Sequence, residues 1–293
     1  TRVKVEIWQE DPLSGMAVIE EVLAEFRRID HLMSPYREAS ELSQLNREAS
    51  AGPVVVSDEL FDLLEKARQM SELTQGAFDI TFASVGHLYD YRKGIQPSAS
   101  ALQAGLPKVN YRFIELNPDD CSVHYSQPGV RIDLGGIAKG YAVDRGILLL
   151  QQQGIEHALI SAGGDSRIIG ERNGRPWNIG IRAPRQAQGM VAVLPLTDVA
   201  VSTSGDYERY FEADGVRHHH ILSPQTGRSA SQVQSVTIIG PNTTQTDALS
   251  TSVFVLGTQA GLELVNRLGD IEAVIIDKQG QMHYSDGLQD IKQ

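Results

Sequence analysis

The sequence predicts an α+β fold with a core of mixed or antiparallel β-sheet and flanking helices. Short β-branched runs follow one another closely from residue 111 onward, and only two or three helical stretches interrupt them. Such clustering favours mixed or antiparallel sheets over the strict strand–helix alternation of a doubly wound fold. The chain has 293 residues, of which 41% are apolar, so it can bury a large core. We expect one domain over residues 1–293 or two interlocked lobes, with an irregular excursion at about 84–110.

The first elements follow from hydrophobic spacing. Residues 2–9 alternate like a strand, and residues 12–33 carry apolar side chains at helical spacing. A second helix is predicted to begin at the Ser57 cap and to stop near Gly76. The intervening segment, Ser34 to Asn46, is expected to be largely loop.

The second half of the chain is predicted to be mostly strand. Strands are expected at 111–115, 121–125, 129–133, 157–161, 166–170, 177–182, 191–195, 198–202, 235–240 and 272–277. A helix at 137–153 is expected to end at Gly154. Another is expected to begin near Asp247, to break at Gly257 and to resume until Gly269.

The composition excludes several classes of protein. Lys plus Arg total 26 against 37 Asp plus Glu, so a net charge of -11 argues against nucleic acid as a partner. A single cysteine, Cys121, excludes an internal disulfide and a thiolate metal cluster. No apolar run approaches the roughly 18 residues of a membrane span. The chain opens at Thr1 with neither an initiator Met nor a signal peptide, so its start is expected to be trimmed or processed.

The segment Arg131–Asp144 has the pattern of an anion site. An apolar strand is predicted to deliver Asp133, the pair Gly135–Gly136 and Lys139 to the start of a helix. Helix N-termini favour anions because their first N–H groups are unpaired and the helix dipole is positive there. The spacing fits neither common nucleotide-binding fingerprint. The alternative is a tight turn with a surface lysine and a capping aspartate.

Asp247 and Thr251 are spaced to share one face of a helix. A carboxylate and a hydroxyl supply two hard oxygens, and Mg²⁺ commonly takes only one or two carboxylates while substrate phosphates complete its shell. The pair therefore suits a metal that bridges to a substrate. In the alternative reading, Thr246 is the N-cap and Asp247 an ordinary acidic residue of the first turn.

Three consecutive histidines end a predicted strand. His218 and His220 would share one side of it, so one of them is a candidate general base, and His219 would point elsewhere. The alternative is solvated histidines at a strand end. A zinc site is weakly supported, because no carboxylate or cysteine stands at a recognised spacing. Serine hydrolase chemistry lacks its Gly-x-Ser-x-Gly motif.

Aromatic and glycine-rich segments add candidates for ligand contact. Phe78 and Asp79 can flank a planar ligand, and Tyr36 can stack on a ring, although a lone loop tyrosine is more often packing. Two more turns, one with glycines and one with hydroxyls, are Gly163–Asp165 and Ser202–Asp206.

Taken in order, seven blocks resemble the ApbE-type flavin transferases, the FAD:protein FMN transferases. They are SPYREASELSQLN at 34–46, GAFDIT at 76–81, DLGGIAKGYAVD at 133–144, GGD at 163–165, TSGD at 203–206, HILSPQTG at 220–227 and DALSTSVFVLG at 247–257. The resemblance covers nearly the whole chain. It implies an α+β architecture related to the T-fold, and Mg²⁺-dependent transfer of FMN from FAD to a Thr or Ser hydroxyl of a target protein, with release of AMP.

The resemblance also implies roles for individual residues. The FAD contacts it implies are Tyr36, Ala77, Phe78, Asp79, Asp133, Lys139 and Ile221. Asp247 and Thr251 would hold the metal, with help from the backbone carbonyl of Gly136. His220 is the candidate base for the incoming hydroxyl, and Asp206 or a metal-bound water is the alternative.

Partners and location are implied by the resemblance alone. The expected acceptors are flavoproteins such as subunits of membrane-bound, ion-translocating redox complexes. The expected location is periplasmic, with the full-length protein anchored to the inner membrane as a lipoprotein. FAD pyrophosphatase action is the enzymatic alternative, and a flavin-binding protein without turnover is another, which the pairing of Asp247 with Thr251 disfavours because passive binding needs no metal face.

Three departures from the family pattern stand out. A methionine-glycine pair before the first strand is absent, so the chain is expected to start inside the family pattern. Ser250 stands where some members carry a carboxylate, which would leave more of the metal coordination to water. Gly136 replaces a residue with a side chain, so only a backbone contact is possible there.

Overall fold

The computed structural model describes residues 1–8, 12–186 and 189–289, and they form two compact units. Unit 1 comprises Thr1–Ile29, Ile137–Gly205 and the chain from Val233, and unit 2 comprises Asp30–Gly136 and Asp206–Gln232. The predicted excursion at 84–110 lies inside unit 2. None of the helices in the described part of the chain is long and apolar enough to cross a membrane.

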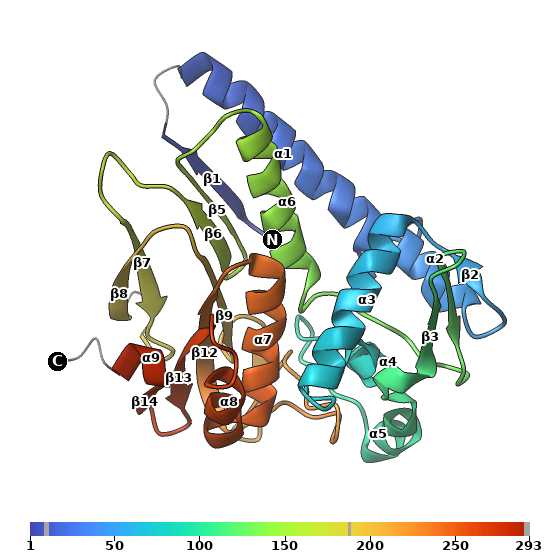
Figure 1. The fold of residues 1–293 in the computed structure, drawn as a ribbon. Coiled ribbons are helices and arrows are strands. Elements are labelled where there is room, and N and C mark those ends of the chain that lie inside the picture. Colours follow the sequence, from blue (N-terminus) through green and yellow to red (C-terminus); the bar gives the residue numbers. More distant parts are fainter. Residues whose placement is uncertain (9–11, 187–188, 290–293) are drawn as a thin grey trace. The chain divides into compact units, whose positions relative to one another are not determined.

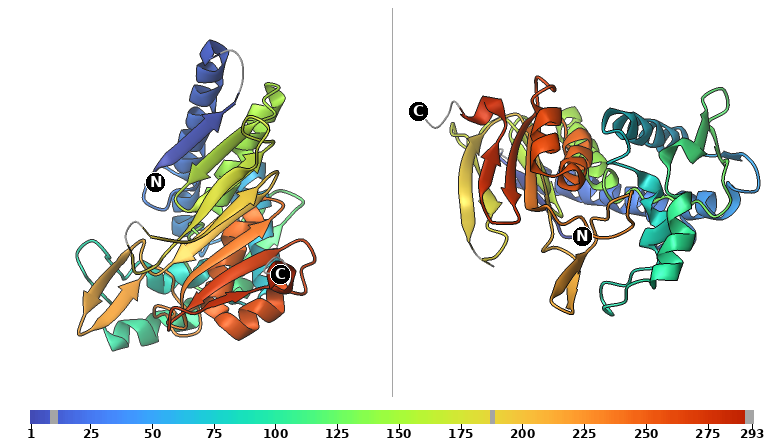
Figure 2. Two further views of the ribbon diagram at one scale, coloured as in Figure 1. Left: turned by 90° about the vertical axis from the view of Figure 1, so that its left-hand side faces the viewer. Right: turned by 90° about the horizontal axis from the view of Figure 1, so that it is seen from below.

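Unit 1 is built on an antiparallel sheet (Figure 1). Among the described residues, seven strands pair in the order β1-β5-β6-β9-β12-β13-β14, and Figure 2 shows them following one another across the unit. Their bounds are Val3–Ile7 (β1), Ala158–Ala162 (β5), Asp165–Ile169 (β6), Ala200–Gly205 (β9), Val233–Gly240 (β12), Glu272–Asp277 (β13) and Met282–Tyr284 (β14). The predicted α+β class with an antiparallel core is confirmed.

Helices cover one face of this sheet and a hairpin lies on the other. The helices are α1 (Pro12–Met33), α6 (Ala138–Gln152), α7 (Thr243–Leu256), α8 (Thr258–Val265) and α9 (Asp286–Gln289), and the hairpin is β7 (Trp177–Arg182) with β8 (Met190–Leu196). Val22 of α1 and Val143 of α6 belong to one core cluster with Ile160 of β5. The next residue back, Leu159, packs instead with Trp177 of the hairpin. Successive residues of a strand face opposite sides, so β5 has a core on each face.

Unit 2 is made of short elements. They are α2 (Glu41–Glu48), β2 (Val54–Val55), α3 (Asp58–Leu73), α4 (Ala83–Gly86), α5 (Ala99–Gly105), β3 (Ile114–Asn117), β4 (Ser122–Tyr125), β10 (Tyr210–Ala213), β11 (Val216–His219) and the 3₁₀ turns Ile80–Phe82, Leu106–Lys108 and Tyr111–Phe113. β2, β4 and β3 form one small sheet, and β10 pairs with β11. The predicted cap of α3 is confirmed, since the Ser57 side chain accepts from the Leu60 N–H.

The prediction that Ser34–Asn46 is largely loop is wrong, because α2 occupies its second half. The Ser40 side chain accepts from the Ser43 N–H and caps the helix. Leu42 and Leu45 are fully buried. A helix of eight residues has only two turns, so its apolar period is too short to stand out in the sequence.

The predicted strand at 129–133 is also wrong, because side chains take the place of a strand partner. Asn46 accepts from the Ile132 N–H at 2.8 Å and donates to the Ile132 carbonyl at 2.9 Å. The Ser84 hydroxyl accepts from the Arg131 N–H at 3.0 Å. The backbone is therefore satisfied without a ladder. The strand expected at 111–115 likewise begins only at Ile114, after a 3₁₀ turn.

Asn46→Ala is expected to lower the free energy of unfolding by about 2–3 kcal/mol, because two buried backbone groups of Ile132 lose their partner. Chemical denaturation of the full chain measures this loss. Gln44→Ala removes an exposed amide from the same helix and should change stability by no more than about 0.5 kcal/mol. Equal stability of the two variants would contradict this account of the segment.

Candidate functional site

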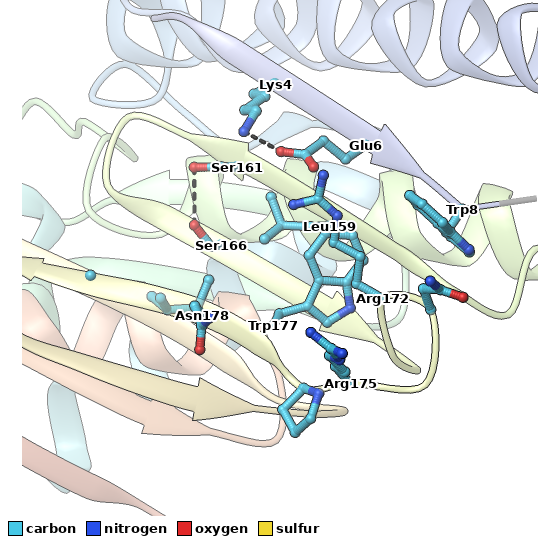
Figure 3. A pocket seen from close by; sticks show the side chains of 14 residues that line it. Lys4, Glu6, Trp8, Leu159, Ser161, Ser166, Arg172, Arg175, Trp177 and Asn178 are labelled. Carbon is cyan, nitrogen blue, oxygen red and sulfur yellow. Dashed lines mark hydrogen bonds and ion pairs between the residues drawn. The ribbon is translucent and has the colours of Figure 1, made fainter.

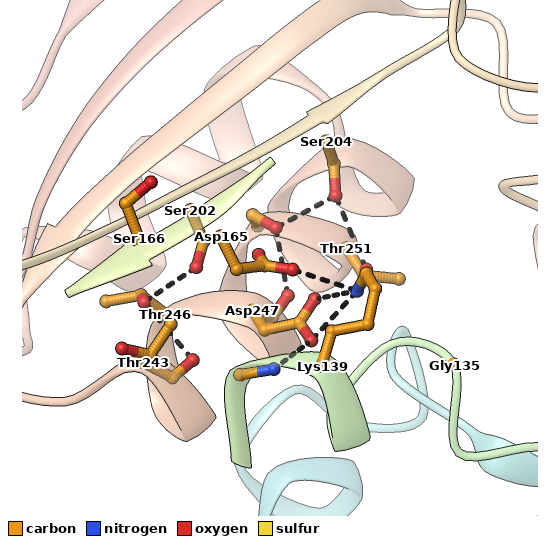
Figure 4. Close-up of polar contacts among 12 residues, drawn as sticks. Gly135, Lys139, Asp165, Ser166, Ser202, Ser204, Thr243, Thr246, Asp247 and Thr251 are labelled. Atoms are coloured by element: carbon orange, nitrogen blue, oxygen red, sulfur yellow. Dashed lines mark hydrogen bonds and ion pairs between the residues drawn. The ribbon is translucent and has the colours of Figure 1, made fainter. Parts of the chain in front are cut away.

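The centre of the site is a lysine held between two buried carboxylates of unit 1 (Figure 4). Lys139 Nζ donates to both carboxylate oxygens of Asp247, at 2.9 Å each. Asp165 Oδ2 lies 3.1 Å from the same nitrogen. Asp165 and Asp247 are each only 2% exposed, whereas the Lys139 side chain is 28% exposed. One ammonium group therefore serves two desolvated carboxylates.

Three elements bring these side chains together. Lys139 lies in the first turn of α6, Asp165 is the first residue of β6, and Asp247 lies in α7. The backbone N–H of Gly140 donates to Asp247 Oδ2 at 3.0 Å. A side chain at Gly140 would collide with the backbone of Thr243, so glycine is what lets α6 and α7 approach this closely.

Asp144 ties the start of α7 to α6. Its carboxylate accepts from the N–H groups of Thr243 and Thr244, at 2.8 and 2.7 Å. The Asn242 side chain caps the same helix by accepting from the Gln245 N–H. The two acceptors satisfy amide groups that a helix N-terminus leaves unpaired, and they hold the helix in place beside Lys139.

The alternative reading of Asp247 as a first-turn residue behind a Thr246 cap is wrong. The helix begins at Thr243, so Asp247 lies in its second turn. The Thr246 hydroxyl is instead buried and hydrogen-bonded to the Ser202 hydroxyl at 2.8 Å. Asp247 is therefore no helix cap; its carboxylate faces Lys139 and the Gly140 amide.

Hydroxyl groups extend the polar cluster along α7. The Ser204 hydroxyl of β9 shares a hydrogen bond with Ser250 at 2.8 Å and lies 3.4 Å from the Thr251 hydroxyl. Ser250 also donates to the Asp247 carbonyl at 2.9 Å. The predicted pair, Asp247 and Thr251, thus lies one helical turn apart in α7, with Asp247 beside Lys139 and Thr251 beside Ser204.

Burial and charge act together on the ionisable groups. Burial, followed by the neighbouring Asp247 carboxylate, raises the pKa of Asp165 to about 7. Burial disfavours the charged form of Lys139, but Asp165 and Asp247 outweigh it, so the pKa of that ammonium lies above its ordinary value. When both carboxylates are ionised, two negative charges face one ammonium group in a desolvated place.

The donor set fits a hard divalent cation. Asp247 and Thr251 offer a carboxylate and a hydroxyl oxygen, and an added positive charge would balance the excess negative charge. Within the described residues, no group of three or more His, Cys, Asp or Glu side chains could by itself hold a metal. Mg²⁺ that takes only one or two carboxylates commonly completes its shell with substrate phosphates.

The start of the predicted phosphate segment lies in unit 2. Asp133 Oδ1 accepts from the Gly135 N–H at 2.7 Å, and the Asp133 N–H donates to the Ile80 carbonyl at 3.0 Å. Gly136 is half-buried and directly precedes Ile137, the N-cap residue of α6. Because Ile137 is apolar, its side chain cannot satisfy the first amides of that helix.

The predicted contacts at 77–79 differ in exposure. Ala77 is half-buried, whereas Phe78 and Asp79 are 3% and 7% exposed. The Asp79 carboxylate accepts from the Thr81 N–H and hydroxyl and from the Tyr111 N–H. Burial raises the pKa of Asp79. Ligand contact by these residues stays a prediction.

Tyr36 contrasts with them. Its side chain is 81% exposed, so it is not a packing residue of unit 2. A large aromatic ring left in solvent is available for stacking. Its proposed contact with a planar ligand also stays a prediction.

The three histidines of unit 2 separate into different roles. His219 is buried and its Nε2 donates to the Ala230 carbonyl at 2.7 Å. His218 stacks on Phe211, with ring centroids 5.0 Å apart. His220 follows the end of β11 and is half-buried, and its neighbour Ile221 is buried. The role of His220 as the base stays a prediction.

Asp165 is the member of the Lys139 cluster to which the sequence analysis gave no role. Gly163–Asp165 suggested only a turn that allows close approach, whereas Asp165 is the second carboxylate on Lys139. The available signal was an aspartate placed directly after a glycine pair and a buried strand. Only the antiparallel pairing of Asp165 with Ser202 shows that it faces α7.

The chain is similar to known proteins of one family. The ApbE family model matches residues 1–275. The FAD:protein FMN transferase of Treponema pallidum is 33% identical over 99% of this chain and 85% of its own. The crystal structure of an ApbE protein from Thermotoga maritima matches with a TM-score of 0.89 at 35% identity, over 99% of this chain and 94% of that one. The flavin transferase ApbE from Vibrio cholerae matches with a TM-score of 0.87 at 29% identity, over 98% and 94%. The chain belongs to the ApbE family.

Proposed function

We propose that this protein is a Mg²⁺-dependent FAD:protein FMN transferase, which moves FMN from FAD to a Thr or Ser hydroxyl of a target protein and releases AMP. The names of its relatives support the reaction class. The observation that carries the proposal is the cluster of Lys139, Asp165 and Asp247 beside Thr251, which combines a cation for phosphate oxygens with oxygens for a metal.

Asp247 and Thr251 would hold the metal, with the Gly136 carbonyl as a third protein ligand. When bound, Mg²⁺ would supply charge screening for the diphosphate and act as a Lewis acid. The two carboxylates of the cluster would then be shared between the ion and Lys139, which suits a site that must accept both a cation and an anionic ligand.

The protein groups have separate tasks in the transfer. The acceptor hydroxyl oxygen attacks the FMN phosphorus, the bond from that phosphorus to the bridging oxygen breaks, and AMP leaves with the electron pair. Lys139 and the first amides of α6 stabilise the negative charge that develops on the phosphate oxygens. His220 takes the proton from the attacking hydroxyl. Asp206 is less suited to this role, because it is 7% exposed and lies 3.5 Å from the Arg217 guanidinium.

The acceptors we propose are flavoproteins of the kind found in membrane-bound, ion-translocating redox complexes, and the place of action is the periplasmic side of the inner membrane, with the full-length protein anchored there as a lipoprotein. Both proposals rest only on the resemblance to the family, whose name specifies neither acceptors nor a location. Labelling of intact cells with a reagent that cannot cross the inner membrane tests the location.

The decisive experiment incubates the protein with FAD, Mg²⁺ and an acceptor protein that carries an exposed threonine. We expect flavin fluorescence to stay with the acceptor on a denaturing gel, one AMP to appear per flavin transferred, and chelation of the metal to abolish both. Soluble FMN plus AMP with no labelled acceptor would support FAD pyrophosphatase action instead. Bound FAD that is never cleaved would leave only a flavin-binding protein.

His220→Ala is expected to slow single-turnover transfer by about 10²–10⁴-fold, the usual worth of a positioned general base. Added imidazole should restore part of the rate, since a free base can then take the proton. His124→Ala removes a half-buried histidine that is paired with Glu115 and should leave the rate unchanged. An undiminished rate for His220→Ala would remove that residue from the mechanism.

A further inference from the structure

Unit 1 has a cavity on the sheet face that the hairpin β7–β8 partly covers (Figure 3). Its volume is about 650 Å³, within the range of small-molecule sites. The side chains that matter most for recognition are Lys4, Glu6, Trp8, Arg172, Arg175 and Trp177. Both tryptophans of the chain therefore line this one cavity.

The cavity lies on the other face of the sheet from Lys139. Asp165, which meets Lys139, is followed in β6 by Ser166, which lines the cavity and hydrogen-bonds to Ser161. Neighbouring residues of a strand point to opposite faces, so the sheet itself separates the two places. Leu159, which forms part of the cavity wall, faces away from the helices in the same way.

The cavity carries positive charge in a protein whose net charge is -11. Lys4 and Glu6 form an ion pair with each other, so their charges cancel. Arg172 and Arg175 are exposed, and within the described chain no carboxylate pairs with either guanidinium. The cavity therefore has a balance of two positive charges, which matches the charge of about -1.5 to -2 on a phosphate monoester.

The aromatic groups add a place for a planar ring and a buried donor. The Arg172 guanidinium lies 5.8 Å from the ring centroid of Trp8 and 5.8 Å from that of Trp177. Trp8 is 45% exposed, so one indole remains open for stacking. Trp177 is 4% exposed, and its Nε1 has no hydrogen-bond partner in the part of the chain that the structure describes. A buried N–H group without an acceptor is unfavourable, and a ligand bound in the cavity can supply that acceptor.

We propose that this cavity binds a nucleoside monophosphate. The base stacks on Trp8, Arg172 and Arg175 hold the phosphate through paired hydrogen bonds, and the indole N–H of Trp177 donates to a ligand oxygen or ring nitrogen. A bare anion cannot use the stacking surface of Trp8, and a neutral nucleoside cannot use the charges of Arg172 and Arg175. Neither is therefore the preferred ligand. This site is separate from the transfer site and does not depend on its function.

Tryptophan fluorescence tests the proposal directly, because both fluorophores lie in the cavity. AMP is titrated into the full chain with excitation selective for tryptophan, and calorimetry gives the affinity independently. We expect saturable quenching by AMP, with adenosine and inorganic phosphate each binding at least about tenfold more weakly, since each lacks one set of contacts.

Variants locate the binding. The pair Arg172→Ala and Arg175→Ala should weaken AMP binding by about tenfold or more, whereas Arg267→Ala removes an exposed arginine outside the cavity and should have no effect. Trp177→Phe keeps a ring, removes the buried N–H and leaves Trp8 as the reporter; it should weaken binding as well. Asp247→Ala should leave this affinity unchanged, which separates the cavity from the transfer site.

Several results would overturn the proposal. They are absence of both quenching and heat with AMP, equal affinity for AMP and inorganic phosphate, and equal affinity of the double arginine variant and Arg267→Ala. None of these readouts uses flavin transfer, so failure here and failure of the proposed activity can be told apart.

Discussion

Asp247→Ala should reduce FMN transfer by about 10²-fold or more, because the variant loses a metal ligand and one of the two carboxylates that hold Lys139. Lys139 would retain only Asp165, 3.1 Å away, and the Gly140 amide would lose its acceptor. AMP release in the presence of FAD, Mg²⁺ and acceptor is the measurement. The affinity for FAD should fall by a smaller factor than the transfer rate, since the flavin contacts proposed for unit 2 remain.

The control for this variant is Asp270→Ala, which removes an exposed carboxylate of the same unit. It should keep the full rate and the full metal dependence. Asp247→Asn keeps the volume and offers one oxygen; we expect it to fold like the wild type and to need more Mg²⁺ for a given rate. AMP release that survives in Asp247→Ala at the wild-type rate would end the metal assignment.

The elements that the sequence predicted well are those with a long period and clear ends. The helix over 12–33 has six turns of apolar spacing, and α3 has both a serine cap and a run of inward leucines. The Asp247 and Thr251 pair was found because a spacing of four residues in a helix is a local property. Local signals are therefore enough to place these two residues on one helix.

What sequence reasoning missed depends on contacts between distant residues. The segment before Asp133 looks like a strand, but its hydrogen bonds go to Asn46, which is 86 residues earlier. The charge environment of Asp247 depends on Lys139, 108 residues away, and Asp165 joins them only through the pairing of β6 with β9. No local pattern records such partners, so the second carboxylate was left without a role.

Gly140→Ala should damage both folding and catalysis, although it replaces glycine by the best helix former. In most helix interiors this change stabilises by about 0.5–1 kcal/mol. At Gly140 an added Cβ would overlap the Thr243 carbonyl oxygen and would lie only 2.8 Å from the Asp247 Cβ. The nearest atom is backbone, so α6 and α7 must move apart. We expect a loss of about 1–3 kcal/mol in the free energy of unfolding.

The same displacement should slow transfer by about 10²-fold, since a shift of about 1 Å in a catalytic arrangement has this effect. Asp247 would move away from Lys139 and from the Gly140 amide, so the variant should also need more Mg²⁺. Gly269→Ala is the matched control: it has open space around the added Cβ and should change neither stability nor rate appreciably. Helix propensity predicts that Gly140→Ala raises the stability, whereas the collision with Thr243 predicts that it lowers the stability. A stabilised and active variant would therefore show that the site does not depend on close contact between α6 and α7.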